Sequence, residues 1–362
     1  MWYQTRASEI LGIQYPILQG PFGGNLSSVD LVSTVSNEGG LGGYGAYTLS
    51  PQEIIEVNQQ IKAATYRPYN INLWVSDSDA IDGTVSAELF KKAQELFKPY
   101  FEELGIDLPE KPAPFKSRFE NQVEAVLHLR PPVFSFIFGI PSADILEQCR
   151  RLRIVTVGAA TTLDEAIVLE SAGVDLIIAS GFEAGGHRPS FLAPAESSTT
   201  GTFVLLQLIK EKVKSPVIAA GGIANGKGVA AALALGADAV QIGTAFLATE
   251  ESNASEMHKQ MLFSDAAKYT TLSKAYTGRT GRGIAGRITT DLAGKEGDFL
   301  PFPLQSQFMS HLNKAAREQG KWDMLFFWSG QISPALRHTK AVGLMKSIID
   351  EAALYFDQRC TR

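Results

Sequence analysis

The sequence predicts an α/β fold, a TIM (β/α)8 barrel with a helical insertion and a helical C-terminal extension covering the active-site face. Eight short apolar runs recur between residues 16 and 243, and helical periodicity follows most of them. Such alternation is typical of a parallel α/β fold. We expect the barrel to occupy residues 1–247, close to the ~250 residues usual for this architecture.

The expected strands cover residues 16–20, 40–45, 69–74, 132–138, 153–157, 175–179, 216–220 and 239–243. Helices are expected between them, over residues 27–37, 50–65, 142–150, 163–172, 202–214 and 227–235. Several begin with capping residues, such as Ser50 with Glu53 and Thr162 with Glu165. Helical connections between successive strands favour a closed barrel.

An open doubly wound sheet is the competing architecture. It requires a G-x-G-x-x-G turn after the first strand and an acidic residue after the second. The first turn here, QGPFGGNLS, lacks that spacing, and no Asp or Glu ends the second run. The barrel is therefore favoured.

Two segments exceed what a barrel needs. Residues 76–130 form a helical insertion, and residues 248–362 form an extension with helical patterns at 253–269, 304–318 and 340–357. Additions on this side of a barrel usually shape the substrate site, so we expect the extension to fold over the mouth and form part of that site. For the insertion two alternatives stay open: it forms part of the site, or it only packs on the outside of the barrel.

The composition limits the function classes. The chain has 362 residues, 45% of them hydrophobic and 20% charged, which is typical of a soluble globular protein. The net charge of −5 argues against nucleic acid as a partner. No apolar run approaches the ~20 residues of a membrane helix, and no signal peptide is visible at the start. Cys149 and Cys360 form neither a disulfide framework nor a metal-ligand spacing, so we expect a cytoplasmic protein.

Two glycine-containing turns follow the last two expected strands. Gly221-Gly222 ends the seventh strand ahead of a helix, and Gly243-Thr244 ends the eighth. Glycines let backbone N–H groups approach an anion, and barrels commonly bind phosphate after strands seven and eight. The pair predicts a phosphate cradle, with simple tight-turn geometry as the alternative.

Asn72 and Gln241 are polar residues inside otherwise apolar strands. A buried amide needs a hydrogen-bond partner. A flat heteroaromatic ring with carbonyl and N–H edges would satisfy both amides, and neighbouring backbone groups are the alternative partners.

His187 lies in SGFEAGGHRPSF, residues 180–191, and alone among five histidines it falls on an expected βα loop. Its ordinary pKa of about 6.5 suits a base that takes a proton from a substrate carbon. No second His or Cys lies at metal-binding spacing, so no metal site is expected, and no Gly-x-Ser-x-Gly elbow is present. A catalytic base and a polar corner residue remain the alternatives.

These motifs together resemble a known family. QGPFGG, VSNEGGLGGYGA, NINLW, SGFEAGGHRPSF, AAGGIANGKGVAAALALGADAVQIGTAFLAT and TGRTGRGIAGR are similar to the nitronate monooxygenases, formerly 2-nitropropane dioxygenases, and more so to their class I branch. The likeness runs from Ile10 to about Thr289.

The resemblance implies a barrel that holds FMN non-covalently. It places Gly185, Gly222, Gly243 and Thr244 at the flavin phosphate, with Gly221 and Ile242 beside them, and Ser180 in contact with the cofactor. It places Gln19, Asn72 and Gln241 near the flavin body and makes His187 the active-site histidine. Pro189 departs from the family, whose members often carry glycine there, which affects the loop's fit to substrate.

The resemblance also implies an activity. Alkyl nitronates such as propionate 3-nitronate would be oxidised with O2 to carbonyl compounds and nitrite, and His187 would act as the base for neutral nitroalkanes. Arg279, Arg282 and Arg287 would attract the anion or cover the phosphate, unless they belong to a solvated loop. The alternatives are a flavin-dependent enoyl-thioester reductase using NADPH and a non-catalytic flavin-binding paralogue.

Overall fold

The computed structural model describes residues 1–75, 85–111 and 117–357. Parts of the expected insertion, 76–84 and 112–116, and Cys360 of the extension lie outside the described residues.

Eight parallel strands form one sheet in the order β1-β9-β8-β6-β5-β4-β3-β2. Backbone hydrogen bonds from Gln19 N to Leu41 O (2.9 Å) and from Leu41 N to Ile17 O (3.0 Å) join the first strand to the segment leading into the second. The sheet thereby curls into a barrel, and the predicted fold class is confirmed. The strands are β1 Ile17–Gln19, β2 Gly42–Gly45, β3 Tyr69–Trp74, β4 Val133–Ile137, β5 Val155–Ala160, β6 Leu176–Ser180, β8 Val217–Ala220 and β9 Ala239–Ile242.

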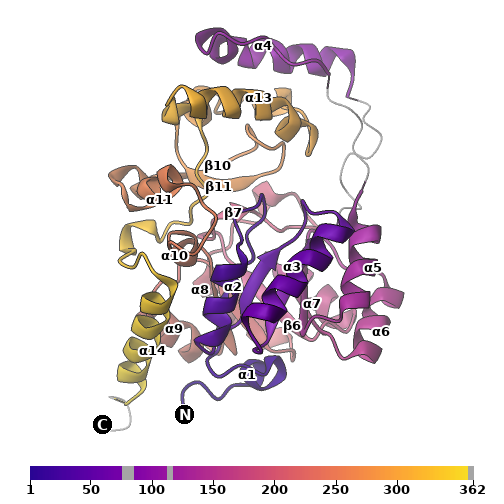
Figure 1. Cartoon of the computed structure of the whole chain (residues 1–362), viewed down its shortest axis with the longest axis vertical. Coiled ribbons are helices and arrows are strands. Elements are labelled where there is room, and N and C mark those ends of the chain that lie inside the picture. Colours follow the sequence, from indigo (N-terminus) through magenta and orange to yellow (C-terminus); the bar gives the residue numbers. More distant parts are fainter. Residues whose placement is uncertain (76–84, 112–116, 358–362) are drawn as a thin grey trace.

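Helices surround the barrel, as Figure 1 shows. The Ser50 hydroxyl accepts the Glu53 N–H and the Glu53 carboxylate accepts the Ser50 N–H, so the predicted capping box is present. The Thr162 hydroxyl accepts the Glu165 N–H at the start of its helix, while the Glu165 carboxylate accepts the N–H of Thr161 instead. The helices of the barrel are α1 Arg6–Leu11, α2 Val29–Asn37, α3 Pro51–Ala64, α5 Phe119–Leu129, α6 Ala143–Leu152, α7 Leu163–Ser171, α8 Thr202–Lys212, α9 Gly226–Ala234 and α10 Thr244–Leu247.

The two ends of the barrel interior differ. Near the start of the strands, Leu18, Val133 and Leu176 pack with Ala7 and Leu11 of α1, which closes that end with apolar side chains. At the carboxyl ends of the strands, polar residues such as Asn72, Ser180 and Gln241 line a cavity together with larger side chains. A site is therefore expected at the carboxyl ends, where barrels of this class place their chemistry.

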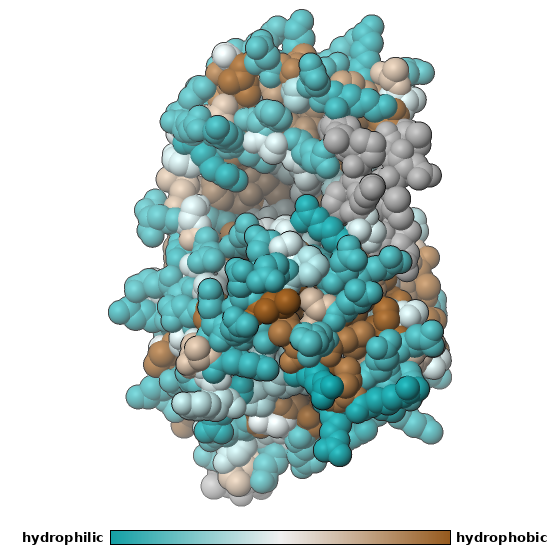
Figure 2. All heavy atoms as spheres, turned by 45° about the vertical axis from the view of Figure 1, so that its right-hand side comes forward, coloured by the Kyte–Doolittle hydropathy of each residue, from teal (hydrophilic) through white to brown (hydrophobic). Residues whose placement is uncertain are grey.

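The insertion divides between two parts of the molecule. α5 packs against α3 in the ring of barrel helices. α4 (Ala87–Glu103) instead packs on α13 (Leu304–Glu318), where Phe97 and Phe101 lie 5.6 and 5.4 Å from the Phe308 ring. Figure 1 shows α4 and α13 as the two layers farthest from the barrel. In Figure 2 the surface is hollowed between this upper unit and the barrel.

The extension is helical, as predicted, and it also contains two short strands that were not predicted. β10 (Thr270–Ser273) and β11 (Gly281–Ile284) pair antiparallel, and β11 also pairs with β7 (Gly186–His187) of the barrel loop. The close packing needs glycine, since a Cβ on Gly283 would lie 2.6 Å from the Phe327 carbonyl oxygen. The remaining elements are α11 Glu256–Phe263, α12 Arg287–Asp291, α14 Ala341–Asp357, and the 3-10 turns η1 Ala195–Ser197, η2 Asp265–Lys268, η3 Glu296–Asp298, η4 Trp322–Met324 and η5 Ser333–Ala335.

The last helix, α14, returns to the barrel. It packs along α9, and a Cβ on Gly226 would lie 2.4 Å from the Ala352 nitrogen, so only glycine permits this approach. Within the described chain, no helix combines the length and the apolar character needed to cross a lipid bilayer. The division into a barrel at 1–247 and an extension at 248–362 stays a prediction.

Candidate active site

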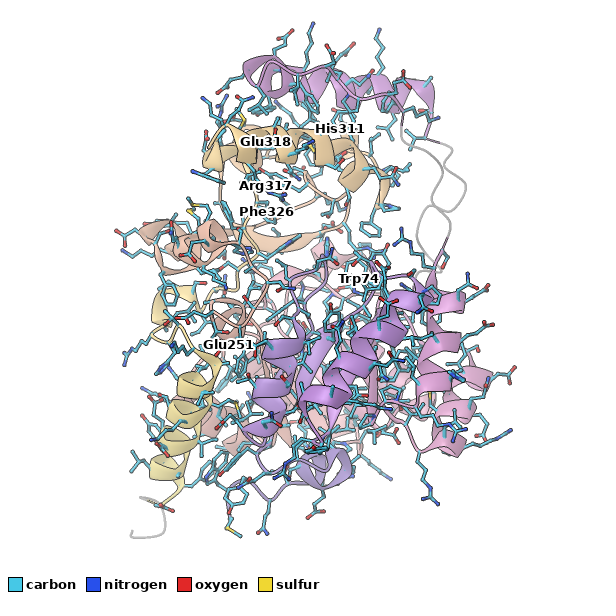
Figure 3. All side chains as sticks on the ribbon, in the orientation of Figure 1. Trp74, Glu251, His311, Arg317, Glu318 and Phe326 are labelled. Carbon is cyan, nitrogen blue, oxygen red and sulfur yellow. The ribbon has the colours of Figure 1, made fainter. Side chains whose placement is uncertain are left out.

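A cavity of about 610 Å³ lies between the carboxyl ends of the strands and the extension. Its size falls within the ~300–1,000 Å³ usual for sites that bind small molecules or cofactors. Trp74, at the end of β3, marks its place on the barrel side in Figure 3. The predicted residues that line it are Asn72, Ser180, Gly185, His187, Gly221, Gly222, Gln241, Gly243 and Thr244.

Gln19 and Ile242 do not line the cavity. The Gln19 side chain is almost fully buried, where its amide nitrogen donates to Gly20 O and its amide oxygen accepts from Gly43 N (2.8 Å). Ile242 packs among the apolar residues between strands and helices, because successive strand residues face opposite sides and Gln241 faces inward. Both residues hold the barrel together at the seam of β1, β2 and β9.

The glycine turns form one end of the cavity. Gly222 has a φ of 70°, which favours glycine. Gly243 has an ordinary φ of −99°, yet a Cβ on it would meet only the Phe22 ring, 3.9 Å away. The space beside Gly243 is therefore open, and it forms a cradle that a side chain would fill. The Thr244 hydroxyl accepts the N–H of Gly330 (2.9 Å), so the extension reaches this end as well.

The inner wall of the cavity is polar. The amide nitrogens of Asn70 and Asn72 donate to the Ser135 hydroxyl oxygen, at 2.8 and 2.9 Å. With both lone pairs of that oxygen occupied, the Ser135 proton is left as a donor beside the cavity. Ser135 was not predicted as a site residue, because an isolated serine in an apolar strand has no distinctive sequence pattern around it.

Glu183 and Arg118 are the charged side chains that line the cavity within the described part of the chain, His187 aside. The Glu183 carboxylate accepts the N–H and the hydroxyl of Thr202 at the start of α8 (2.8 and 2.9 Å). The Arg118 guanidinium is exposed and donates to Thr48 O (2.7 Å). The glycine end thus offers backbone and hydroxyl groups to an anion, while the cation lies at an exposed position.

His187 occupies the other end of the cavity, where the extension covers it. Its backbone pairs with Gly281 of β11, and its Nε2 lies 2.9 Å from the Thr277 hydroxyl. Burial, followed by the positive charge of Arg279, lowers the pKa of His187 to about 3. The imidazole is therefore neutral at physiological pH.

Aromatic rings surround this histidine. The rings of Trp74 and Trp328 lie 5.3 and 4.7 Å from the imidazole, with Phe302 at 6.1 Å and Phe138 at 6.4 Å. Trp328 and Phe302 belong to the extension and lie more than a hundred residues from His187 in the chain. Sequence reasoning missed them because aromatic residues in a tail are usually packing residues, and no local pattern marks these as site residues.

Arg188 and Pro189, the two residues after His187, have different surroundings. Pro189 lines the cavity. Arg188 is 1% exposed, and its guanidinium donates to the carbonyl oxygens of Gly181 (2.6 Å) and Ser198 (2.8 Å). Arg188 therefore fixes the loop to the end of β6 rather than facing the substrate space.

The arginines singled out from the extension have separate roles. Arg279 stacks on Phe138 (3.9 Å) and Phe302 (4.4 Å), next to His187. Arg282 is buried and donates to Phe182 O (3.0 Å), and Arg287 forms an ion pair with Glu103 of α4 (2.6 Å). Arg279 alone of the three lies close to the histidine, and Arg287 links the extension to α4.

Across the described residues, no group of three or more His, Cys, Asp or Glu side chains gathers as a metal site. Cys149 is buried in the core, and burial raises the pKa of its thiol to about 11.

Comparisons with known proteins agree with this geometry. The family model described as nitronate monooxygenase matches residues 4–351. A probable nitronate monooxygenase of Staphylococcus haemolyticus is 36% identical, covering 97% of this chain and 98% of that protein.

Solved structures share the fold. The nitroalkane oxidase of Streptomyces ansochromogenes is 30% identical with a TM-score of 0.86, covering 96% of this chain and 97% of that one. FabK from Thermotoga maritima, at 24% identity and a TM-score of 0.74 with 99% of each chain covered, shows likeness of fold alone. The match along almost the whole chain and the similarity to these relatives show that this protein belongs to the nitronate monooxygenase family.

Proposed function

We propose that the protein is an FMN-dependent nitronate monooxygenase that converts small alkyl nitronates and O2 into carbonyl compounds and nitrite. The observation that carries the proposal is the single cavity onto which both the glycine turns and His187 open. Family membership supports the general reaction.

The cavity suits FMN in two respects. Gly222, Gly243 and Thr244 offer a cradle for the phosphate, where backbone N–H groups and a hydroxyl bind an anion. Asn72, Ser135 and Gln241 offer amide and hydroxyl groups to the edge of the flavin ring. When bound, the flavin supplies the electron transfer between nitronate and O2 that no side chain of the site provides.

The aromatic end suits a small organic substrate. Trp74, Phe302 and Trp328 enclose a compact apolar space around the neutral His187 imidazole. A neutral nitroalkane would lose the proton on the carbon next to its nitro group to His187, whereas a preformed nitronate would need no base.

Absorption spectroscopy of the purified protein tests the cofactor, since bound FMN gives a yellow protein. Oxygen uptake with propionate 3-nitronate and with ethylnitronate, together with nitrite release, tests the reaction. A colourless protein that added FMN does not reconstitute would contradict the cofactor. Flavin reduced quickly by NADPH but untouched by nitronates would favour an enoyl-thioester reductase, for which the FabK likeness at 24% identity is evidence of fold only.

A further inference from the structure

The Thr277 hydroxyl lies at the centre of a short hydrogen-bond network with His187. Its Oγ1 is 2.9 Å from His187 Nε2 and donates to the carbonyl oxygen of Arg279, also at 2.9 Å. The Arg279 N–H donates to the same Oγ1 at 3.3 Å. Three groups therefore meet at one hydroxyl oxygen.

Counting protons shows which nitrogen of the imidazole carries hydrogen. A threonine hydroxyl has one proton and two lone pairs, and a carbonyl oxygen only accepts. When the hydroxyl proton is donated to the Arg279 carbonyl, both partners on the lone-pair side must donate. In that arrangement His187 Nε2 carries the ring proton, and the lone pair of the neutral ring lies on Nδ1.

We propose that Thr277 is a positioning residue that holds neutral His187 in the tautomer protonated on Nε2, which makes Nδ1 the atom that accepts the substrate proton. The identity of that substrate rests on the proposed function. In the step, the Cα–H bond of a nitroalkane breaks, its proton passes to Nδ1, and the electron pair stays on the substrate as the nitronate. The resulting imidazolium keeps its Nε2–H bond to Thr277.

The surrounding structure holds Thr277 in position. Thr277 N and Gly278 N both donate to Lys274 O, at 3.2 and 2.7 Å, in a turn between β10 and β11. Gly278 has a φ of 81°, and a Cβ on it would lie 2.4 Å from Leu300 O, so this turn is fixed against the segment before α13. β11 in turn pairs with the strand that carries His187.

Fixing the tautomer matters because the ring is neutral before substrate binds. Burial and the Arg279 charge both lower the pKa of His187, so at neutral pH the choice lies between two neutral tautomers. In one of them Nε2 is the acceptor, and its lone pair points at Thr277 rather than toward substrate. A residue that removes that form increases the fraction of enzyme able to act as base.

The test is ¹⁵N NMR of the histidine rings in the flavin-loaded protein at pH 7, with His187→Asn used to assign the signals. We expect wild type and Thr277→Ser to show a protonated Nε2 and an unprotonated Nδ1. Thr277→Val keeps the shape but has no hydroxyl, and we expect both ring nitrogens to move toward the averaged shifts of a tautomer mixture. A wild-type ring protonated on Nδ1, or a Thr277→Val ring unchanged from wild type, would overturn the proposal.

Kinetics provide the second readout. For a neutral nitroalkane we expect Thr277→Val to lose on the order of tenfold in kcat/KM, within the range that a positioned base contributes, while Thr277→Ser stays close to wild type. For the preformed nitronate we expect little loss in either variant. Equal losses on both substrates would contradict the proposal. If neither substrate is turned over by wild type but the ring shifts are as expected, the proposed function fails and the role of Thr277 in holding the tautomer stands.

Discussion

The two ends of the cavity are built in different ways. The end at Gly222 and Gly243 is made of backbone and small residues at the ends of adjacent barrel strands. The end at His187 is made of side chains, and the rings of Phe302 and Trp328 come from the extension. In the proposed function, the barrel end of the cavity would bind the cofactor, and the extension would form the space around the histidine.

The largest effect is expected from His187→Asn. The change removes the base while keeping a polar side chain of smaller size, so kcat/KM for nitroethane should fall by about 100-fold or more. The loss on ethylnitronate should be clearly smaller, because that substrate arrives deprotonated. Initial rates of nitrite release on the two substrates measure the difference. Equal losses on both would show that His187 does not act as the base.

Gly243→Val tests the glycine end. The φ of −99° accepts valine, and the added methyl groups enter the cradle, so FMN affinity should fall about 10- to 100-fold, the equivalent of the ~1–3 kcal/mol typical of overpacking. Fluorescence titration of the apoprotein with FMN measures this.

Gly297→Val is the matched control for that change, since a Cβ on Gly297 meets no atom within 4 Å and the residue does not line the cavity. Its affinity for FMN should equal that of wild type. If Gly243→Val bound FMN as tightly as wild type, the prediction that this turn binds the FMN phosphate would be wrong.

Arg279→Met tests the charge beside the histidine. Burial lowers the pKa of His187 more than Arg279 does, so removing the guanidinium should raise this pKa only partway toward its ordinary value. Protonated His187 has no lone pair, and nitroalkane activity falls as pH drops through its pKa. The acid limb of kcat/KM should therefore move to higher pH than in wild type, where no inflection near pH 6.5 is expected. An unmoved limb would mean that Arg279 does not act on His187.

The lowered pKa of His187 also makes the free energy of unfolding depend on pH. Because the folded pKa of His187 lies below the unfolded value of about 6.5, the unfolded state binds the proton more readily. This group therefore lowers stability as pH falls below about 6.5 toward 3. Urea unfolding of wild type and His187→Asn at pH 7 and pH 5 measures the difference, and a wild type that loses no more stability than the variant would contradict it.

The smallest effect is expected from Arg287→Gln. Arg287 is paired with Glu103 of α4, and both side chains are partly exposed, so the free energy of unfolding should change by less than about 1 kcal/mol. FMN affinity and turnover should match wild type. A double-mutant cycle with Glu103→Gln isolates the pair, and a change in FMN affinity would mean that the extension also acts on the cofactor end.

Much of the barrel was predictable because its signals are local. Apolar runs, the capping box at Ser50 and Glu53, and the glycine turns lie within a few residues of one another. The insertion was harder, since the same helical pattern describes α5, which covers the barrel, and α4, which packs on Phe308 of α13. The short strands of the extension were not predicted: β10 pairs only with β11, and the other partner of β11, His187, is almost a hundred residues away.

Sequence by itself determined the fold class, and it singled out the glycine turns and the histidine that line the cavity, because each depends on neighbouring residues or on a motif. Tertiary structure alone decided that Gln19 bonds to backbone, that Ser135 joins Asn72, and that Thr277 and Trp328 reach His187. The first two contacts join neighbouring barrel strands, and the last two arise where a strand of the extension pairs with a barrel loop. In both cases the orientation of a side chain depends on packing rather than on its neighbours in the chain.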